Sequence, residues 1–417
     1  MIRLPRYRPD RLPARVARLP SELVRQQARA IIDDVRTRGL EAVVEHARRL
    51  GDLRDDDVLV IDRPGLQRAL ARLSSNAIGV LTRSAERVRT FATAHRAAVA
   101  NIEVPAPGGR AGITHRAVDT AGCYAPGGRF PLPSSVLMTA VTARAAGVES
   151  VIVASPRPSS ETLAAAAIAG ADAVLAVGGA QAIAALAFGL PDLPASDVIV
   201  GPGNAWVTAA KQLLAGEVRI DMLAGPSELL VIADDGATPA LVAADLLAQA
   251  EHDPDALPML AAHSEAFVLE VERALGAQLA DLPTRDIAER ALARGAAIVV
   301  DDTRAAATVA NALAVEHVAL HVAAPEACRA QLRHYGALFL GHGSAEVFGD
   351  YAAGPNHVLP TGGTARSHGG LSVLDFLRPQ MWLAVQPQRA PALIDDVTAL
   401  ARMEGLEGHA RAALARR

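Results

Sequence analysis

The residues best suited to chemistry are histidines, carboxylates and one amide in four short segments. Asp350 and His357 belong to residues 349–361, which contain two prolines and a glycine at each turn. Because proline lacks a backbone N–H and restricts the residue before it, we expect a rigid polar loop there and no helix. The other segments are residues 249–252, 316–317 and 404–409. Together they offer nitrogen and oxygen donors without cysteine, which indicates a catalytic metal site.

Gln249 and His252 lie at the end of a helix that we expect to begin at Pro239. Side chains three residues apart share a helix face, so these two could meet one cation. The alternative is a polar helix end, with His252 near the negative pole of the helix dipole. Asp350 and His357 add a second group of donors and His409 a third, which gives a Gln, His, Asp, His set. Such a set is unlike structural zinc sites, which favour cysteine, and suits a metal with positions open to substrate.

Glu316 and His317 are predicted to lie between a helix and an apolar strand, with His317 at the entry of the strand. Glutamate and histidine are usual groups for general acid–base chemistry near neutral pH. An exposed loop pair is the alternative. His321, on the same strand, is predicted to be a structural histidine.

Glycine-rich turns precede three predicted helices, at residues 124–129, 178–181 and 201–204. Each turn would direct backbone N–H groups from a helix N-terminus at one sheet edge, which favours anions such as phosphate. None is a Gly-x-Gly-x-x-Gly fingerprint or a P-loop. A tight strand-to-helix turn without a ligand is the alternative.

Composition excludes several classes of protein. A chain of 417 residues should form two main domains, and a net charge of −4 gives no general field for nucleic acid. Cys123 and Cys328 form no disulfide framework, which fits the reducing cytoplasm. Residues 163–190 carry little charge, but buried parallel strands and their helices explain this better than a membrane span. Lys211 is the only lysine, so any Schiff-base chemistry would depend on it.

The chain alternates short apolar strands with helices from about residue 115, which predicts an α/β fold with two Rossmann-like, doubly wound parallel sheets. Helices are expected over residues 21–50 and 63–99. The expected strands are residues 151–154, 173–177, 198–200 and 218–222, then 229–233, 259–262, 297–300, 318–322 and 337–340.

These elements suggest a division into domains. Residues 21–117 and 228–378 would form a first α/β domain, with N-terminal helices and the metal and acid–base residues. Residues 118–227 would form a second α/β domain. Residues 1–20 would be an extended arm, and residues 379–417 a helical tail that leaves its domain and docks on a partner subunit.

Several of these motifs occur in an order that resembles the histidinol dehydrogenase family, over residues 21–417. They are PGG at 126–128, GGAQAI at 178–183, GPGN at 201–204, IDMLAGPSE at 220–228, QAEH at 249–252, EH at 316–317, residues 349–361 and EGLEGHA at 404–410. The resemblance implies a homodimer with one zinc per subunit. It also implies oxidation of L-histidinol to L-histidine through L-histidinal, with two molecules of NAD.

The resemblance further implies roles for individual residues. Zinc would be bound by Gln249, His252, Asp350 and His409, and the acid–base pair would be Glu316 and His317. Substrate would contact Ser227, His357 and Glu404. NAD would bind the second domain, residues 118–227, in contact with Tyr124, Gln181 and Asn204. Glu404 and His409 would reach in from the partner subunit, so the active sites would be shared.

Several positions depart from the family pattern. Val315 replaces a proline, Trp206 a smaller aromatic residue and Phe130 a small residue, and Leu40 and residues 189–191 also differ. They surround the predicted site and bear on the substrate more than on the reaction type. Two alternatives stay open. One is a paralogous four-electron, NAD-dependent dehydrogenase of another small polar alcohol. The other is a zinc hydrolase in which Glu316 activates metal-bound water.

Overall fold

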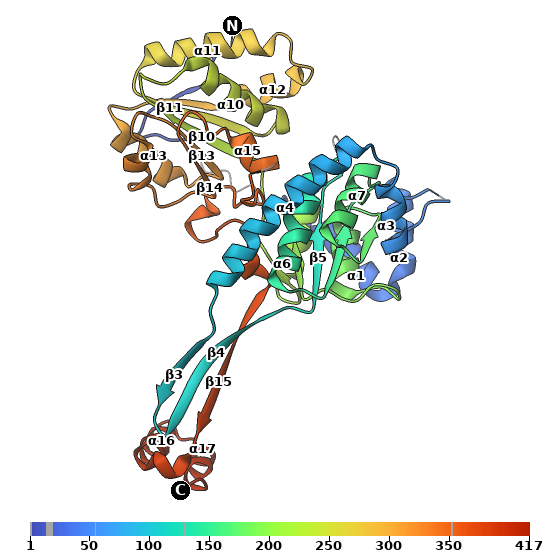
Figure 1. The fold of residues 1–417 in the computed structure, drawn as a ribbon, viewed down its shortest axis with the longest axis vertical. Coiled ribbons are helices and arrows are strands. Elements are labelled where there is room, and N and C mark those ends of the chain that lie inside the picture. Colours follow the sequence, from blue (N-terminus) through green and yellow to red (C-terminus); the bar gives the residue numbers. More distant parts are fainter. Residues whose placement is uncertain (1, 14–19, 55, 128–130, 352) are drawn as a thin grey trace.

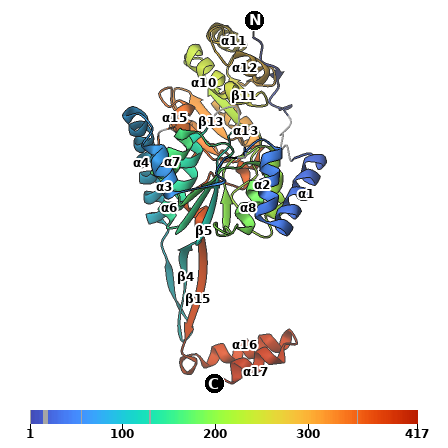
Figure 2. The same ribbon diagram turned by 90° about the vertical axis from the view of Figure 1, so that its right-hand side faces the viewer.

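Two six-stranded sheets organise the chain, and the computed structural model describes residues 2–13, 20–54, 56–127, 131–351 and 353–417. Each sheet has helices on both faces (Figures 1 and 2). A thin three-stranded sheet projects from this body and ends in the C-terminal helices (Figure 1). The prediction of two Rossmann-like, doubly wound α/β sheets is confirmed.

The first sheet contains the strand that begins at His317, and all its strands are parallel. In spatial order its strands are β1 (Arg6–Tyr7), β12 (Ala296–Val299), β11 (Leu257–Ala262), β10 (Glu228–Ala233), β13 (His317–His321) and β14 (Ala337–Leu340). One face packs on α10 (Pro239–His252), α11 (Glu265–Leu279) and α12 (Arg285–Leu292), and the other on α13 (Thr303–Leu313) and α14 (Pro325–Arg329). The N-terminal arm therefore contributes β1, the strand at one edge of this sheet.

The five parallel strands of the second sheet follow the same spatial order as β12, β11, β10, β13 and β14 of the first sheet. A further strand at the edge of the second sheet is antiparallel. In spatial order its strands are β2 (Val60–Asp62), β7 (Ala173–Leu175), β6 (Ser150–Ala154), β5 (Thr120–Tyr124), β8 (Val198–Val200) and β9 (Arg219–Ile220). Near-continuous apolar runs form these strands because both faces are buried under helices.

The N-terminal helices pack on this second sheet, which differs from their predicted place in the first domain. On one face lie α1 (Glu22–Arg38), α2 (Leu40–Arg49), α8 (Gly179–Phe188) and α9 (Ala205–Leu214). On the other lie α3 (Arg63–Leu70), α4 (Ser75–Ala98), α5 (Pro133–Val136), a π-helical turn (Leu137–Val141), α6 (Thr142–Ala146) and α7 (Ser160–Ala169). The apolar faces of these helices indicate that the helices are packed against the core, but they do not indicate which sheet they cover.

The predicted helix over residues 21–50 is two helices that meet at Gly39. Gly39 has a φ of 57°, which other residues rarely adopt, and it ends α1 and precedes α2. The turn folds α2 back toward α8 and brings His46 to Asp34, with His46 Nε2 2.8 Å from Asp34 Oδ2.

The prediction that the chain is helical from Pro379 is wrong for its first part. The strands β3 (Ile102–Ala106), β4 (Gly109–Ala117) and β15 (Leu377–Val385) form an antiparallel stalk. Pro379 is tolerated because β15 is an edge strand. Only beyond the stalk do the tail helices α16 (Pro391–Met403) and α17 (Glu407–Leu414) begin, far from the two sheets (Figures 1 and 2).

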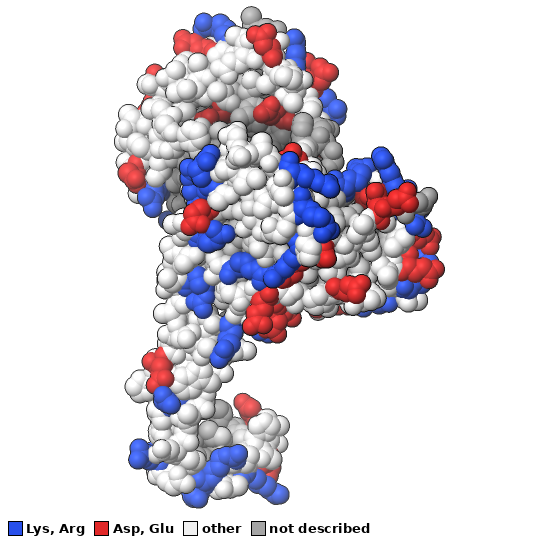
Figure 3. All heavy atoms as spheres, turned by 45° about the vertical axis from the view of Figure 1, so that its right-hand side comes forward, with Lys and Arg blue, Asp and Glu red and all other residues white. Residues whose placement is uncertain are grey.

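The surface of the molecule carries both charges. On the face drawn in Figure 3, arginine and lysine side chains are interspersed with aspartate and glutamate. Among the described residues, no helix is both long and apolar enough to span a bilayer.

Candidate active site

A cavity of about 220 Å³ lies where one edge of the first sheet faces the second domain. Its lining includes Ser227, at the boundary between the domains, and from the first domain His252, Glu316, His317, Asp350 and His357. From the second domain come Pro126, Ser135, Pro202 and Gly203. The structure thus brings together the predicted acid–base pair, two predicted metal ligands and two predicted substrate residues. Ser227 and Glu316 directly precede β10 and β13, so the site occupies the N-terminal edge of the first sheet.

His317 is held as a neutral base. Its Nδ1 lies 3.2 Å from the backbone carbonyl oxygen of Glu228, which can only accept, so Nδ1 carries the proton. Nε2 then bears the lone pair, is buried and has no hydrogen-bond partner among the described residues. Burial lowers the pKa of His317 to about 4. The imidazole is therefore neutral at pH 7, with its free nitrogen directed at carboxylates.

Glu316 is the second acid–base candidate, and it is buried beside His317. Its Oε2 accepts the backbone N–H of Glu228 at 2.9 Å and lies 3.6 Å from His317 Nδ1. Burial raises the pKa of Glu316 well above its usual value, although the N–H of Glu228 and the side chain of Ser227 oppose this. A carboxyl group with a raised pKa suits proton transfer near neutral pH.

Three of the four predicted metal ligands come from two helices near this cavity. Gln249 and His252 occupy the last turn of α10, as predicted, and His252 Nε2 lies 3.5 Å from Asp350 Oδ2. Asp350 lies on α15 (Glu346–Tyr351), so the expectation that this segment is a loop is wrong at its start. The prolines at 355 and 360 follow the helix and do not interrupt it.

The donor set fits a divalent cation. Gln249 is fully buried, and neither its amide nitrogen nor its amide oxygen has a partner among the described residues. Donor atoms of His252, Glu346 and Asp350 lie within 4.8 Å of one another. A buried amide oxygen next to clustered imidazole and carboxylate groups matches nitrogen and oxygen coordination by zinc.

Glu346 was missed by the sequence analysis. It is fully buried, and its Oε1 lies 3.7 Å from His317 Nε2. Burial, and next the charge of Asp350, raise the pKa of Glu346 to about 9. In the sequence, the spacing of four residues between Glu346 and Asp350 could have indicated that the two side chains lie close together. That spacing is meaningful only once the segment is known to be helical.

The remaining predicted residues of this site divide into two groups. His357 lies in the loop after α15, where its Nδ1 is 2.7 Å from the Asp350 carbonyl oxygen and its Nε2 is 3.4 Å from Ser135 Oγ. Glu404 and His409 lie on the exposed tail beyond the stalk, remote from the cavity of their own chain (Figure 1). His321 is structural, as predicted, with Nε2 2.8 Å from Asp245 Oδ2.

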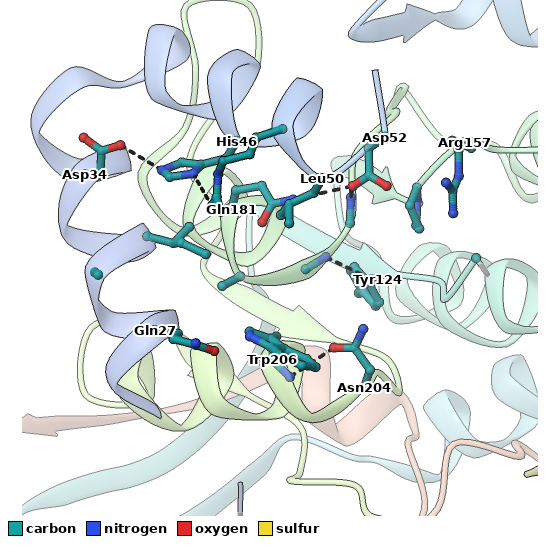
Figure 4. A pocket seen from close by; sticks show the side chains of 18 residues that line it. Gln27, Asp34, His46, Leu50, Asp52, Tyr124, Arg157, Gln181, Asn204 and Trp206 are labelled. Atoms are coloured by element: carbon teal, nitrogen blue, oxygen red, sulfur yellow. Dashed lines mark hydrogen bonds and ion pairs between the residues drawn. The ribbon is translucent and has the colours of Figure 1, made fainter. Parts of the chain in front are cut away.

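The predicted NAD contacts line a larger pocket of about 700 Å³ (Figure 4). Tyr124, Gln181 and Asn204 come from the edge where the strands of the second sheet end, and Trp206 stands among them (Figure 4). Helices α1 and α2 close the opposite side with Asp34 and His46. Asn204 Oδ1 caps α9 by accepting the N–H groups of Trp206 and Val207 at 3.0 and 3.1 Å.

Two of the glycine-rich turns bind carboxylates of the chain itself. The N–H of Gly178 donates to Asp52 Oδ2 at 2.9 Å, and the N–H of Gly201 donates to Asp221 Oδ2 at 2.7 Å. These two N–H groups are therefore satisfied internally, which favours the alternative of a turn without a bound anion.

The positions that depart from the family pattern have different surroundings. Val315 is buried in the core under α13, and Trp206 is 41% exposed on the wall of the larger pocket. Phe130, and with it the end of the first glycine-rich turn, lies outside the described residues.

Comparisons with known proteins identify the relatives of this chain. The family model described as "Histidinol dehydrogenase" matches residues 15–417. The histidinol dehydrogenase of Thermus thermophilus is 44% identical over 392 residues, which cover 93% of this chain and 93% of the relative. That of Pseudomonas putida is 43% identical over 399 residues, covering 94% and 90%. The crystal structure of histidinol dehydrogenase from Elizabethkingia anophelis superposes with a TM-score of 0.89 and 31% identity, covering 95% of this chain and 92% of that one. This chain belongs to the histidinol dehydrogenase family.

Proposed function

We propose that this enzyme oxidises L-histidinol to L-histidine through L-histidinal, reducing two molecules of NAD, as a step of histidine biosynthesis. The proposal rests on family membership and on one observation above all: His317 Nε2, which has no hydrogen-bond partner among the described residues, lies 3.9 Å from Asp350 Oδ1, a proposed metal ligand. The two buried cysteines of the enzyme, Cys123 and Cys328, are free thiols, which suit a reducing compartment. We therefore place the enzyme in the cytoplasm.

The proton steps follow from the positions of two residues. In each oxidation His317 Nε2 takes the proton of the substrate hydroxyl group, first from the alcohol and then from the hydrated aldehyde. Between the two oxidations, Glu316 takes a proton from the water whose oxygen adds to the aldehyde carbon. The aldehyde oxygen regains the proton that His317 Nε2 took from the alcohol, which leaves His317 neutral for the second oxidation. NAD, when bound, accepts the hydride from that carbon, and zinc, when bound, orients the polar groups of the substrate.

We assign one zinc to Gln249, His252 and Asp350 of one subunit, with His409 of the partner subunit. The buried amide of Gln249, which has no partner in the described part of the chain, supports this assignment, because an amide oxygen without a partner is costly in an apolar interior. Ser227 and His357 line the same cavity and would hold the substrate, together with Glu404 of the partner subunit.

A homodimer with shared sites would place Glu404 and His409 at the cavity. The tail supports this, because Val397, Leu400 and Met403 of α16 are exposed apolar side chains, with Met403 81% exposed. Apolar side chains so exposed on a detached helix mark an interaction surface. Near the cavity, Phe348 and Tyr351 of α15 are also exposed. They would give the apolar side chains of the partner's tail a surface to pack against.

We place NAD in the pocket of Tyr124, Gln181 and Asn204. This pocket and the catalytic cavity meet at the turn between β8 and α9, where Asn204 lines the first and Gly203 the second. A dinucleotide in the larger pocket could therefore extend its reactive end toward His317. The buried Gln181, whose Oε1 is unpartnered among the described residues, would contribute a hydrogen-bonding group.

The direct test is a panel of small polar alcohols and amino alcohols with NAD, followed by NADH absorbance. We expect L-histidinol to give the highest kcat/KM, and His317→Asn to lose a factor of about 10²–10⁴, the usual effect of a lost general base. Another alcohol that outperforms histidinol would support a paralogous dehydrogenase. Hydrolysis without NAD reduction would support a zinc hydrolase.

A further inference from the structure

A second cavity, of about 320 Å³, adjoins the catalytic cavity at the N-terminal edge of the first sheet. We call it the rear cavity. Three segments of the chain contribute one residue to the catalytic cavity and a neighbouring one to the rear cavity: Ser227 and Glu228, Glu316 and Val315, and Thr361 and Gly363. The two cavities are therefore separated by a wall only one or two residues thick.

The rear cavity contains a buried carboxyl group that the proposed mechanism does not use. Glu228 is 5% exposed, and its Oε1 accepts the N–H of Gly362 at 3.1 Å. Its Oε2 is buried and has no hydrogen-bond partner among the described residues. Buried polar atoms are almost always paired, so this exception needs an explanation. Most of the surrounding lining is apolar, with Leu257, Met259, Ala296, Leu313 and Val315.

Glu228 is the direct neighbour of Glu316 across two adjacent strands. In the parallel pair of β10 and β13, Leu229 lies opposite His317, so Glu228 and Glu316 face each other one residue earlier. Adjacent strands are about 4.8 Å apart. The N–H of Glu228 donates to Glu316 Oε2 at 2.9 Å, which draws the Glu316 carboxyl group toward Glu228. Burial raises the pKa of Glu316, and the charge of Glu228 raises it further.

Glu316 needs a partner of this kind. In the proposed mechanism it gains one proton from water in each turnover and must lose that proton before the next. Its side chain is buried, and it lines a cavity that substrate and NAD occupy through both oxidations. Burial raises the pKa of Glu228 to about 7, so this group can both take up and release a proton near neutral pH. Arg294, which also lines the rear cavity, is 40% exposed, so the rear cavity reaches the surface.

We propose that Glu228 relays the proton of Glu316 to the rear cavity. The O–H bond of protonated Glu316 breaks, and the proton forms an O–H bond with Glu228 Oε2, directly or across one bridging water. Glu228 then gives the proton to water in the rear cavity, and both groups are carboxylates again. This inference rests on the role proposed for Glu316 and extends it, because substrate and proton would use opposite sides of one wall.

A structural role is the alternative, since Glu228 also holds the N–H of Gly362. Glutamine at this position keeps an oxygen acceptor for that N–H but cannot carry a proton. The two roles differ in their time course. Enzyme that is equilibrated before mixing has Glu316 in its resting state, so the first turnover needs no relay and every later turnover does. A structural defect would slow the first turnover as well.

The test follows NADH formation from histidinol by stopped flow in the full-length dimer. It compares wild type, Glu228→Gln and the control Glu326→Gln, which makes the same change at a glutamate 73% exposed on α14. We expect Glu228→Gln to form the first two NADH per active site at the wild-type rate or faster. Its later turnovers should be about 10²-fold slower, at the lower end of the range for a lost proton transfer. The control should match wild type in both phases.

Glu228→Asp keeps a carboxyl group and should have a faster steady state than Glu228→Gln. The relay would be overturned if Glu228→Gln had the wild-type steady state, if its first turnover were slowed as much as the later ones, or if Glu228→Asp were no faster. Glu316→Gln in the same assay keeps the two proposals apart. If it slows histidinal oxidation from the first turnover while Glu228→Gln behaves as wild type, the role of Glu316 stands and the relay is wrong. If Glu316→Gln oxidises histidinal at the wild-type rate, both are wrong.

Discussion

The single lysine of the chain is buried in an ion pair beside the pocket in which we propose that NAD binds. Lys211 Nζ pairs with Asp221 Oδ1 and donates to the Gly201 carbonyl oxygen at 2.9 Å, with the two side chains 3% and 0% exposed. Asp221 also accepts the N–H of Gly201 at 2.7 Å and of Met222 at 2.6 Å. The pair thus fixes the turn that leads to Asn204.

Lys211→Met should therefore destabilise the second domain strongly. The substitution keeps the apolar stem but leaves the Asp221 carboxylate buried without its cation, a change that costs about 3–5 kcal/mol. With a urea slope of about 3 kcal/mol/M, the unfolding midpoint should fall by at least about 1 M. The fluorescence of Trp206, on the same helix as Lys211, can follow the transition. We also expect a higher KM for NAD, because the turn carrying Asn204 loses its support.

The double variant Lys211→Met/Asp221→Asn separates the lost charge pair from the lost packing. Asparagine keeps an oxygen acceptor for the Gly201 N–H but has no charge, so the double variant should recover about 2–3 kcal/mol relative to the sum of the single changes. The exposed Arg72→Met serves as control and should stay within about 0.5 kcal/mol of wild type. A loss of less than about 1 kcal/mol in Lys211→Met, or no coupling in the double variant, would refute this reasoning.

Three further predictions concern the proposed site. His252→Ala should show much-reduced zinc by metal analysis, because it removes an imidazole donor next to Asp350; full occupancy would exclude His252 as a ligand. Mixing inactive His317→Ala and His409→Ala subunits should restore activity in heterodimers, because one of their two shared sites has both residues intact. No recovery after confirmed subunit exchange would count against sharing. Glu316→Gln should slow oxidation of histidinal selectively, by about 10²–10⁴, since only that step needs water, and a wild-type rate with histidinal would exclude the water-activating role.

Much of the fold could be predicted because buried parallel strands are short apolar runs between turns. The ends of β8 and β14 match the predicted residues, and α10 begins at Pro239 and ends at His252 as expected. The stalk could not be predicted from local pattern. Pro379 pairs with His115, more than 260 residues earlier in the sequence, and such long-range pairing leaves no periodicity that signals its partner.

The candidate site was predictable in its residue types but not in all its members. Glu316, His317, His252 and Asp350 lie together in the structure as their chemistry suggested. Glu346 was hidden because the prolines after Asp350 indicated a loop, whereas the helix ends before them. The packing of the N-terminal helices on the second sheet could not be predicted from the sequence either. An apolar helix face indicates that the face is buried, but it does not indicate which sheet the helix packs against.

The proposed four-electron oxidation in one active site has a stoichiometry that a single experiment can measure. With limiting L-histidinol and excess NAD, the NADH formed and the final product are measured together at completion. We predict two NADH per histidinol, with L-histidine as the product and no accumulation of histidinal. One NADH per histidinol with the aldehyde as end product, or no NAD reduction at all, would contradict the account.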